Sequence, residues 1–280
     1  MKADRISWRH FALMACMVLM TVVSGAYGAP VVSKELRQEV EETLDRMEAD
    51  SPKLMDLVAE MKEAGASYIP EIMAPAAIEK YQKDERQRLI AGVYLADLSY
   101  AFVFGVNRDI MDYGLAVSSL MDQQGFPMPK LDQSFQQALS QEGGPEADER
   151  FQEIRKILNE DTSWKERLGS AKGLDVVADS LYAWIMESLY LVSEMTAQSN
   201  YDPKFLKILG DHTAYLKSYS ALADKVDANP ELAALLETRE RRNTIGKVLA
   251  ALSVEKGIGQ KEVEEVRKIV GREREKIVAK

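Results

Sequence analysis

The chain has 280 residues, of which 46% are hydrophobic and 29% charged, and its 45 acidic and 36 basic side chains give a net charge of −9. This composition is ordinary for a globular protein, and it excludes an intrinsically disordered chain, a collagen and a coiled-coil fibre. The negative charge also disfavours nucleic acid as a partner, because the phosphates would be repelled.

The N-terminal segment has the pattern of a secretory signal peptide. Basic side chains within residues 1–9 precede an uncharged run over 11–23, and small residues follow. Cleavage after Gly28 or after Ala26 fits the pattern of small residues. The uncharged run is short for a membrane-spanning helix, which needs roughly 20 apolar residues. The sequence predicts an exported protein, periplasmic or secreted, with an uncleaved anchor or a lipoprotein attached at Cys16 as the alternatives.

Removal of a signal peptide over residues 1–28 would leave a chain without Cys and with a single His, His212. Disulfide bonds, thiol catalysis and Cys/His zinc sites are then excluded, and the sequence has neither an EF-hand loop nor a Gly-rich phosphate loop. We therefore expect no metal and no cofactor, and we assign no catalytic residue. Residues 29–258 are expected to form a single helical domain, followed by a charged C-terminal helix over 259–280.

Apolar residues recur with a period of 3.6 along the chain, which predicts an all-α fold. Ser33 and Pro52 begin the first two helices and Gly65 ends the second. A linker with Pro70 and Pro75 follows. The remaining helices are predicted over residues 76–104, 107–124, 131–141, 146–159, 174–198 and 203–226, from 230 onward, and over 259–280.

Two segments of the chain are similar to each other. Residues 96–103 read ADLSYAFV and residues 178–185 read ADSLYAWI, and each lies in a long predicted helix followed by a turn and a second helix. This spacing favours an array or bundle of antiparallel helical hairpins with an internal, solenoid-like pseudo-repeat.

Both of these long helices are nearly uncharged. Residues 89–106 contain one charged side chain, Asp97, and residues 174–192 contain Asp175, Asp179 and Glu187. A helix that is apolar on all sides is either a central core helix or a membrane span. An Asp at the middle of a span costs about 3 kcal/mol on insertion. We therefore expect both helices in a protein core.

A carboxylate inside such a helix must be paired, hydrogen-bonded or protonated. One interpretation is structural: a neighbouring Arg or Lys, or a Tyr hydroxyl, satisfies Asp97 within the core. The other is functional: Tyr94, Asp97, Tyr100, Asp179 and Tyr182 line a cleft between hairpins and bind a ligand.

Residues 92–101, GVYLADLSYA, resemble a signature stretch of an uncharacterised family of exported bacterial all-helical proteins. Residues 184–190, WIMESLY, are similar to a second segment of that family. The resemblance implies a helical fold and an exported location, and it implies no activity.

Three functions are compatible with these observations. The favoured one is an exported, non-enzymatic helical protein that binds a protein partner or a small ligand in a groove between hairpins. A second is an enzyme that cleaves cell-wall or other polysaccharides with buried carboxylates such as Asp97, Asp179 or Glu187 as the general acid. A third is a structural component of the envelope, in which membrane contact would involve only the basic C-terminal helix, residues 259–280.

Overall fold

The computed structural model describes residues 32–50, 54–81, 86–125, 170–228, 238–253 and 257–279. Helices make up most of these ranges and no β-strand is found in them, which confirms the predicted all-α fold. The predicted signal peptide and the short helices predicted over 131–141 and 146–159 lie outside the described residues. In chain order the elements are α2 (Lys34–Asp50), α3 (Leu54–Glu63), the 3-10 turn η2 (Pro70–Ile72), α4 (Ile78–Tyr81), α5 (Gln87–Phe104), α6 (Asn107–Gln123), α10 (Ala171–Gln198), α11 (Pro203–Asp211), α12 (Thr213–Asp227), α14 (Thr238–Leu252) and α15 (Gln260–Val278).

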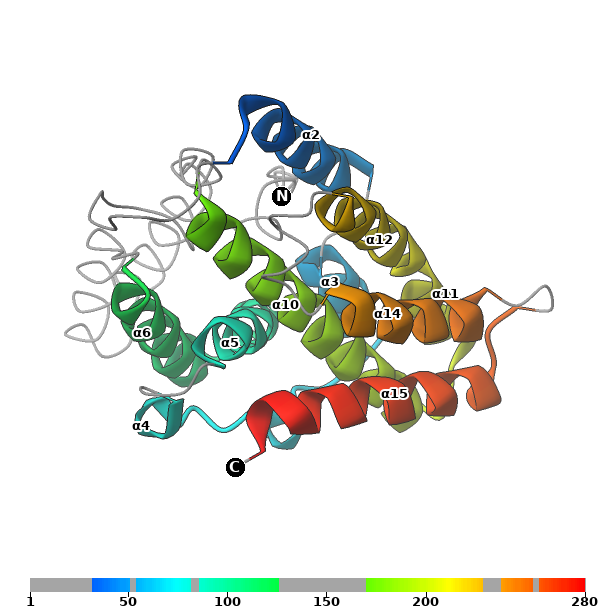
Figure 1. The fold of residues 1–280 in the computed structure, drawn as a ribbon. Helices are drawn as coiled ribbons and strands as arrows, with labels where there is room; N and C mark the ends of the chain where they lie inside the picture. Colours follow the sequence, from blue (N-terminus) through cyan, green and yellow to red (C-terminus); the bar gives the residue numbers. More distant parts are fainter. Residues whose placement is uncertain are drawn as a thin grey trace, which may run out of the picture.

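Helix α10 runs through the middle of the molecule (Figure 1), and α3, α5, α11, α12 and α15 all pack against it. This position explains its apolar sequence, because a helix surrounded by neighbours has apolar residues on every side. Ser170 starts α10 by accepting a hydrogen bond from Gly173 N–H at 3.0 Å. Within the described residues, no helix has the length and apolar character required to cross a membrane.

The closest helix contact lies where α5 crosses α10. A Cβ atom added at Gly92 would collide with the backbone carbonyl oxygen of Ser180 and would lie 3.0 Å from the Cβ of Ala183. Glycine at this position therefore lets the two backbones approach. The polar groups of the crossing are also satisfied, since Ser180 Oγ donates to Arg88 O at 2.9 Å.

Helices α5 and α6 form an antiparallel hairpin with extensive contact. Gly105 ends α5 in the left-handed conformation, with φ of 71°, and its N–H bonds back to the last turn of the helix. Helix α10 is followed by α11 and α12 rather than by one long partner. A true structural repeat of the two hairpins therefore stays a prediction.

Two predicted helices are interrupted. The predicted helix over 203–226 breaks at His212 into α11 and α12. The predicted helix over 76–104 begins two residues later than expected, with α4 at Ile78. Residues 82–85 lie outside the described residues, and Arg86 forms a turn before α5 begins at Gln87. The segment of residues 69–77, called the strap below, contains η2 and otherwise has no regular structure.

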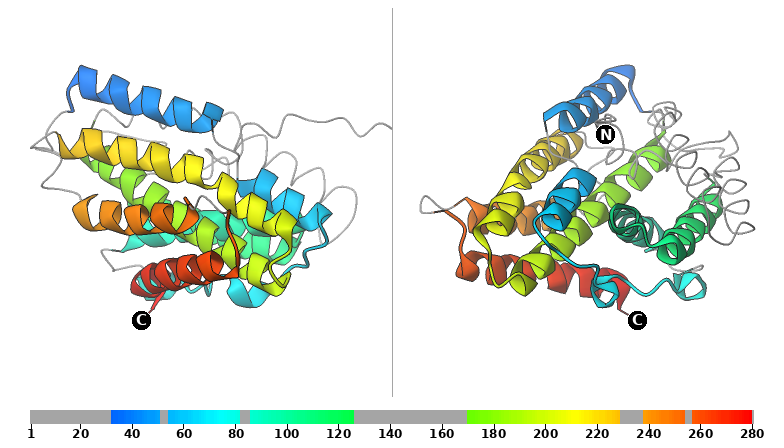
Figure 2. Two further views of the ribbon diagram at one scale, coloured as in Figure 1. Left: turned by 90° about the vertical axis from the view of Figure 1, so that its right-hand side faces the viewer. Right: turned by 180° about the vertical axis from the view of Figure 1, so that it is seen from behind.

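The C-terminal helix α15 lies across α10 and α14 (Figures 1 and 2). Val263, Val266 and Val270 on one face of α15 are fully buried in the core shared with the other helices. Its C-terminal end lies beside α4, where Tyr81 donates a hydrogen bond to Val278 O at 2.5 Å. Cationic side chains also bond its last carbonyl oxygens, among them Arg86 on Lys276 O at 3.0 Å, which suits the negative end of a helix dipole.

Candidate functional site

Three polar side chains of α5 hold the strap. Tyr94, Asp97 and Tyr100 are spaced three apart, which places them on one face of the helix, and each bonds the strap backbone. Ile69 N–H donates to Tyr100 Oη at 2.9 Å, Ala74 N–H to Asp97 Oδ2 at 3.1 Å and Ala77 N–H to Tyr94 Oη at 3.1 Å, and Tyr94 donates to Pro75 O at 2.8 Å. The strap needs such partners because it lacks a helical ladder of its own and is partly buried.

The neighbouring helices contribute further bonds to the strap. Tyr113 of α6 donates to Ala74 O at 2.5 Å, and Arg274 of α15 donates to Ile72 O at 3.0 Å. The strap is therefore bonded to three helices: α5 and α6, which follow it in the sequence, and the distant α15.

Asp97 lies at the centre of a buried charge cluster. Its exposed fraction is 0%, and it lies within hydrogen-bond reach of Glu187 of α10, which is also buried. Both carboxylate oxygens of Glu187 approach Arg274 Nε, at 2.9 and 2.8 Å. Burial, with the nearby charge of Glu187 as the second cause, raises the pKa of Asp97 well above its ordinary value. Burial also raises the pKa of Glu187, while Arg274 opposes that shift.

Asp179 belongs to a second cluster, in which two positively charged arginines contact one carboxylate. It lies between two arginines, with Oδ2 at 2.6 Å from Arg88 Nε and Oδ1 at 2.5 Å from an Arg241 terminal nitrogen. The Arg241 guanidinium also lies over the ring of Tyr182, 5.2 Å from its centroid. Burial raises the pKa of the adjacent Asp175 to about 6, although both arginines oppose this shift.

The five residues predicted to line one cleft therefore lie in two places. Tyr94, Asp97 and Tyr100 contact the strap, whereas Asp179 and Tyr182 contact the arginine cluster and α15, where Tyr182 donates to Glu273 at 3.1 Å. Among the described residues, no hydrogen bond joins one group to the other. The structural interpretation of Asp97 identified an Arg or a Tyr hydroxyl as its partner, and the hydrogen-bond donor found here is a backbone N–H.

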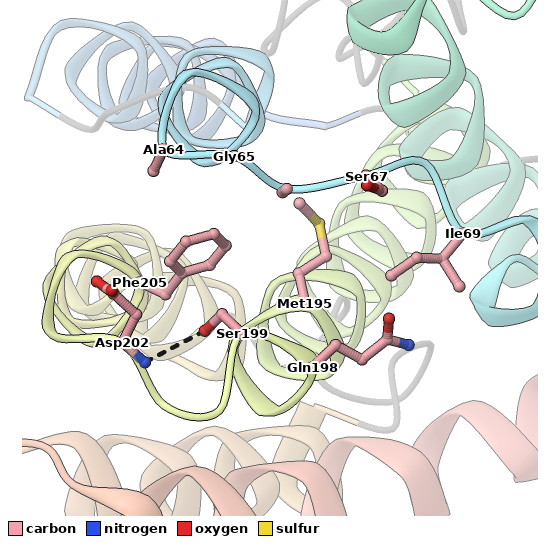
Figure 3. Close-up of a pocket in the computed structure, with 10 residues that line it drawn as sticks. Ala64, Gly65, Ser67, Ile69, Met195, Gln198, Ser199, Asp202 and Phe205 are labelled. Carbon is pink, nitrogen blue, oxygen red and sulfur yellow. Dashed lines mark hydrogen bonds between the residues drawn. The ribbon is translucent and has the colours of Figure 1, made fainter.

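The candidate binding site is a cavity that the sequence did not indicate (Figure 3). It has a volume of about 330 Å³ and lies between the C-terminal end of α3 and the turn joining α10 to α11. Its lining consists of Ala64, Gly65, Ala66, Ser67, Ile69, Met195, Gln198, Ser199, Asp202 and Phe205. The strap begins at this cavity, since Ile69 belongs to both.

The turn between α10 and α11 forms one wall of the cavity and is conformationally unusual. Asn200 and Tyr201 have φ values of 57° and 61°, a left-handed conformation that is uncommon outside glycine. Hydrogen bonds fix the turn: Ser199 Oγ accepts from Asp202 N–H at 3.2 Å (Figure 3), and Tyr201 donates to Glu264 of α15. Asp202 then caps α11 by accepting from Lys204 N–H at 2.8 Å.

His212 is not placed as a catalytic base. The side chain is buried at the junction of α11 and α12, with Nδ1 at 3.4 Å from Ile208 O, and burial lowers its pKa to about 4. Within the part of the chain that the structure describes, no three His, Cys, Asp or Glu side chains gather as metal ligands.

Comparison with protein-family models, with curated proteins and with solved structures found no match for this chain. The resemblance of residues 92–101 and 184–190 to an exported helical family therefore stays a prediction.

Proposed function

We propose that the chain is an exported, non-enzymatic protein that binds a small ligand in the cavity between α3 and the α10–α11 turn. The observation that carries this proposal is the cavity itself, whose volume of about 330 Å³ matches the lower range of small-molecule sites. Its lining presents more polar than apolar surface, which suits a ligand that is held by hydrogen bonds.

The chemistry of the lining indicates the class of ligand. The polar residues of the lining include Ser67, Gln198 and Asp202, of which Asp202 also caps α11 through Oδ1, and no Lys or Arg is among the lining residues. Met195 and Phe205 supply apolar surface. This arrangement favours a neutral or cationic molecule with hydroxyl or amine groups, and it disfavours an anion, which would meet Asp202 without a counter-charge.

The burial of the carboxylates favours binding over polysaccharide cleavage. A glycosidic mechanism needs two carboxyl groups that reach the same sugar, but Asp97 is fully buried and both oxygens of Asp179 are occupied by arginines. Neither residue, nor Glu187, lines the cavity. A cleaving enzyme would need a carboxylate pair elsewhere.

Two arginines of α15 are paired with acids of α10, whereas Lys261, Lys268 and Arg272 of the same helix are exposed. Arg267 bonds Glu194 at 2.7 Å and Arg274 bonds Glu187, both on α10. Basic side chains that pair with acids of the same chain are not available to an anionic lipid surface. A contact with an anionic surface would therefore have to involve the exposed basic side chains and not Arg267 or Arg274.

The proposal is tested by thermal unfolding with three panels of probes: neutral sugars, primary amines and dicarboxylates. A molecule that binds the folded state alone raises the unfolding temperature, and the stabilisation grows with the logarithm of its concentration once that exceeds the Kd. We expect stabilisation by a sugar or an amine, and its loss in Ala66→Trp, which fills the cavity. The matched control is Ala221→Trp, at an exposed position of α12. Stabilisation that persists in Ala66→Trp, or that is confined to dicarboxylates, would contradict the proposal.

A further inference from the structure

We infer that Asp97 is a protonated carboxylic acid in the folded protein, and that its proton completes a pH-sensitive network of hydrogen bonds. This network joins the strap to α5, α10 and α15. The inference rests on the charge cluster alone and does not depend on the proposed ligand.

The geometry around Asp97 requires a hydrogen on one of its oxygens. Oδ2 accepts a hydrogen bond from Ala74 N–H at 3.1 Å, but Oδ1 is completely buried and meets no donor. A buried acceptor without a donor costs free energy. Glu187, within hydrogen-bond reach, carries only acceptors when ionised. A proton on Oδ1 turns this unsatisfied contact into a hydrogen bond from Asp97 to Glu187.

The ion pair decides which of the two acids keeps the proton. Both oxygens of Glu187 lie within 3 Å of Arg274 Nε, so the negative charge is stabilised on Glu187. Asp97 has a neutral backbone amide as its donor. With Asp97 protonated, the cluster contains one carboxylate and one guanidinium and is neutral.

The other titratable groups that face the cluster do not supply a second positive charge for Asp97. Most of these groups are tyrosines, which are neutral at ordinary pH. On α10 and α15 the other acid and base are Glu194 and Arg267, which bond each other. These groups are Tyr94 and Tyr100 from α5, Tyr68 and Glu71 from the strap side, Tyr113 from α6, Tyr190 and Glu194 from α10, and Arg267 from α15.

Loss of this proton weakens the attachment of the strap at Ile72. An ionised Asp97 would set a second negative charge beside Glu187 and compete for Arg274, which also holds Ile72 O at 3.0 Å. The hydrogen-bond network is therefore most stable when Asp97 carries the proton. In the unfolded chain the carboxyl of Asp97 releases its proton above about pH 4, whereas in the folded protein it keeps the proton up to its raised pKa. Between these two pKa values, the free energy of unfolding therefore falls as pH rises. One such proton changes the unfolding equilibrium constant tenfold per pH unit.

The substitution Asp97→Asn imitates the protonated acid. Its carbonyl oxygen can accept from Ala74 N–H and its amide can donate to Glu187, but it cannot ionise. We expect the variant to fold and to be at least as stable as the parent at pH 8. As pH rises above about 4, it should differ from the parent in pH dependence by up to tenfold in the unfolding constant per pH unit. The matched control, Asp179→Asn, loses a carboxylate held by two arginines. Its stability should fall at pH 8. Its pH dependence should change only through the neighbouring Asp175, whose pKa Asp179 helps to raise, so that the contribution of Asp97 stays.

His212 raises the free energy of unfolding as pH rises, which opposes the effect of Asp97. Because His212 is present in every variant, its contribution cancels when the variants are compared with the parent. An Asp97→Asn variant that is destabilised at pH 8, or that keeps the parental pH dependence, would overturn the inference. A second measurement reports the protonation of Asp97 directly. In carbon NMR with ¹³C-labelled Asp carboxyls, the resonance that is missing from Asp97→Asn identifies Asp97. In the parent this resonance should still be that of a protonated acid at a pH where the exposed Asp carboxyls have ionised, and a resonance that ionises together with theirs would equally overturn the inference.

Discussion

Asp179 offers a sharp test of how the helices around α10 are held together. Replacement by Asn removes a carboxylate held between two arginines, of which Arg241 is 9% exposed and Arg88 is 32% exposed. Removal of one partner from a buried ion pair costs about 3–5 kcal/mol, because the other charge stays buried without compensation. The contact with the partly exposed Arg88 contributes at most about 1 kcal/mol. Since Asn keeps one acceptor oxygen, we expect a loss near the lower end, about 3 kcal/mol.

The assay is urea unfolding at pH 7, followed by the helical circular dichroism signal. Two further variants separate the contributions of the arginines. Arg241→Met should cost clearly more than Arg88→Met, because Arg241 is more deeply buried and also covers the ring of Tyr182. A loss below about 1 kcal/mol for Asp179→Asn, or equal losses for the two arginine variants, would refute the reasoning.

Three other predictions test separate parts of the fold. Gly92→Ala should lower the free energy of unfolding by about 3 kcal/mol, the upper end for overpacking, because the new methyl group meets the backbone carbonyl of Ser180. Urea unfolding measures this loss, and an unchanged midpoint would contradict the close crossing of α5 and α10. Tyr113→Phe should cost about 1–3 kcal/mol, because it leaves the Ala74 carbonyl without its donor, and faster hydrogen exchange of the strap amides checks it. His212 is held neutral with its pKa lowered to about 4, so the unfolded state binds its proton first as pH falls. Its contribution is complete above about pH 6.5, and about 3 kcal/mol should be lost as pH falls toward 4; His212→Gln should reduce this loss, and an identical pH profile would refute it.

The helices could be predicted from sequence where the apolar period and the cap residues agree. Ser33 was expected to begin the first helix, and its hydroxyl accepts from Leu36 N–H at 3.2 Å. The linker with Pro70 and Pro75 was predicted, but its attachment to α5 was not. Residues 76 and 77 were expected to be helical, whereas Ala77 N–H donates to Tyr94 Oη and the helix begins at Ile78. Such tertiary bonds override local propensity and leave no periodic trace in the sequence.

For the candidate site, the sequence predicted which side chains are buried but not their partners. Asp97 in an otherwise uncharged helix indicates a desolvated carboxyl, and the structure places it at 0% exposure. Arg274 could not be chosen as the nearby cation, because α15 carries several basic side chains with similar spacing. The cavity beside Asp202 also had no sequence signal, since it forms from a turn and the end of a distant helix.

The two similar segments show why a local motif does not fix the chemistry of its acid. Asp97 and Asp179 occupy the same place in the sequences ADLSYAFV and ADSLYAWI, and both are buried in long helices. Asp179 meets two guanidinium groups, which stabilise its charge. Asp97 meets a backbone amide and another carboxyl that already has its own arginine, so its neutral form is favoured. The difference lies in the elements packed outside each motif, and for this reason the same Asp→Asn substitution should leave stability unharmed at one site and lower it at the other.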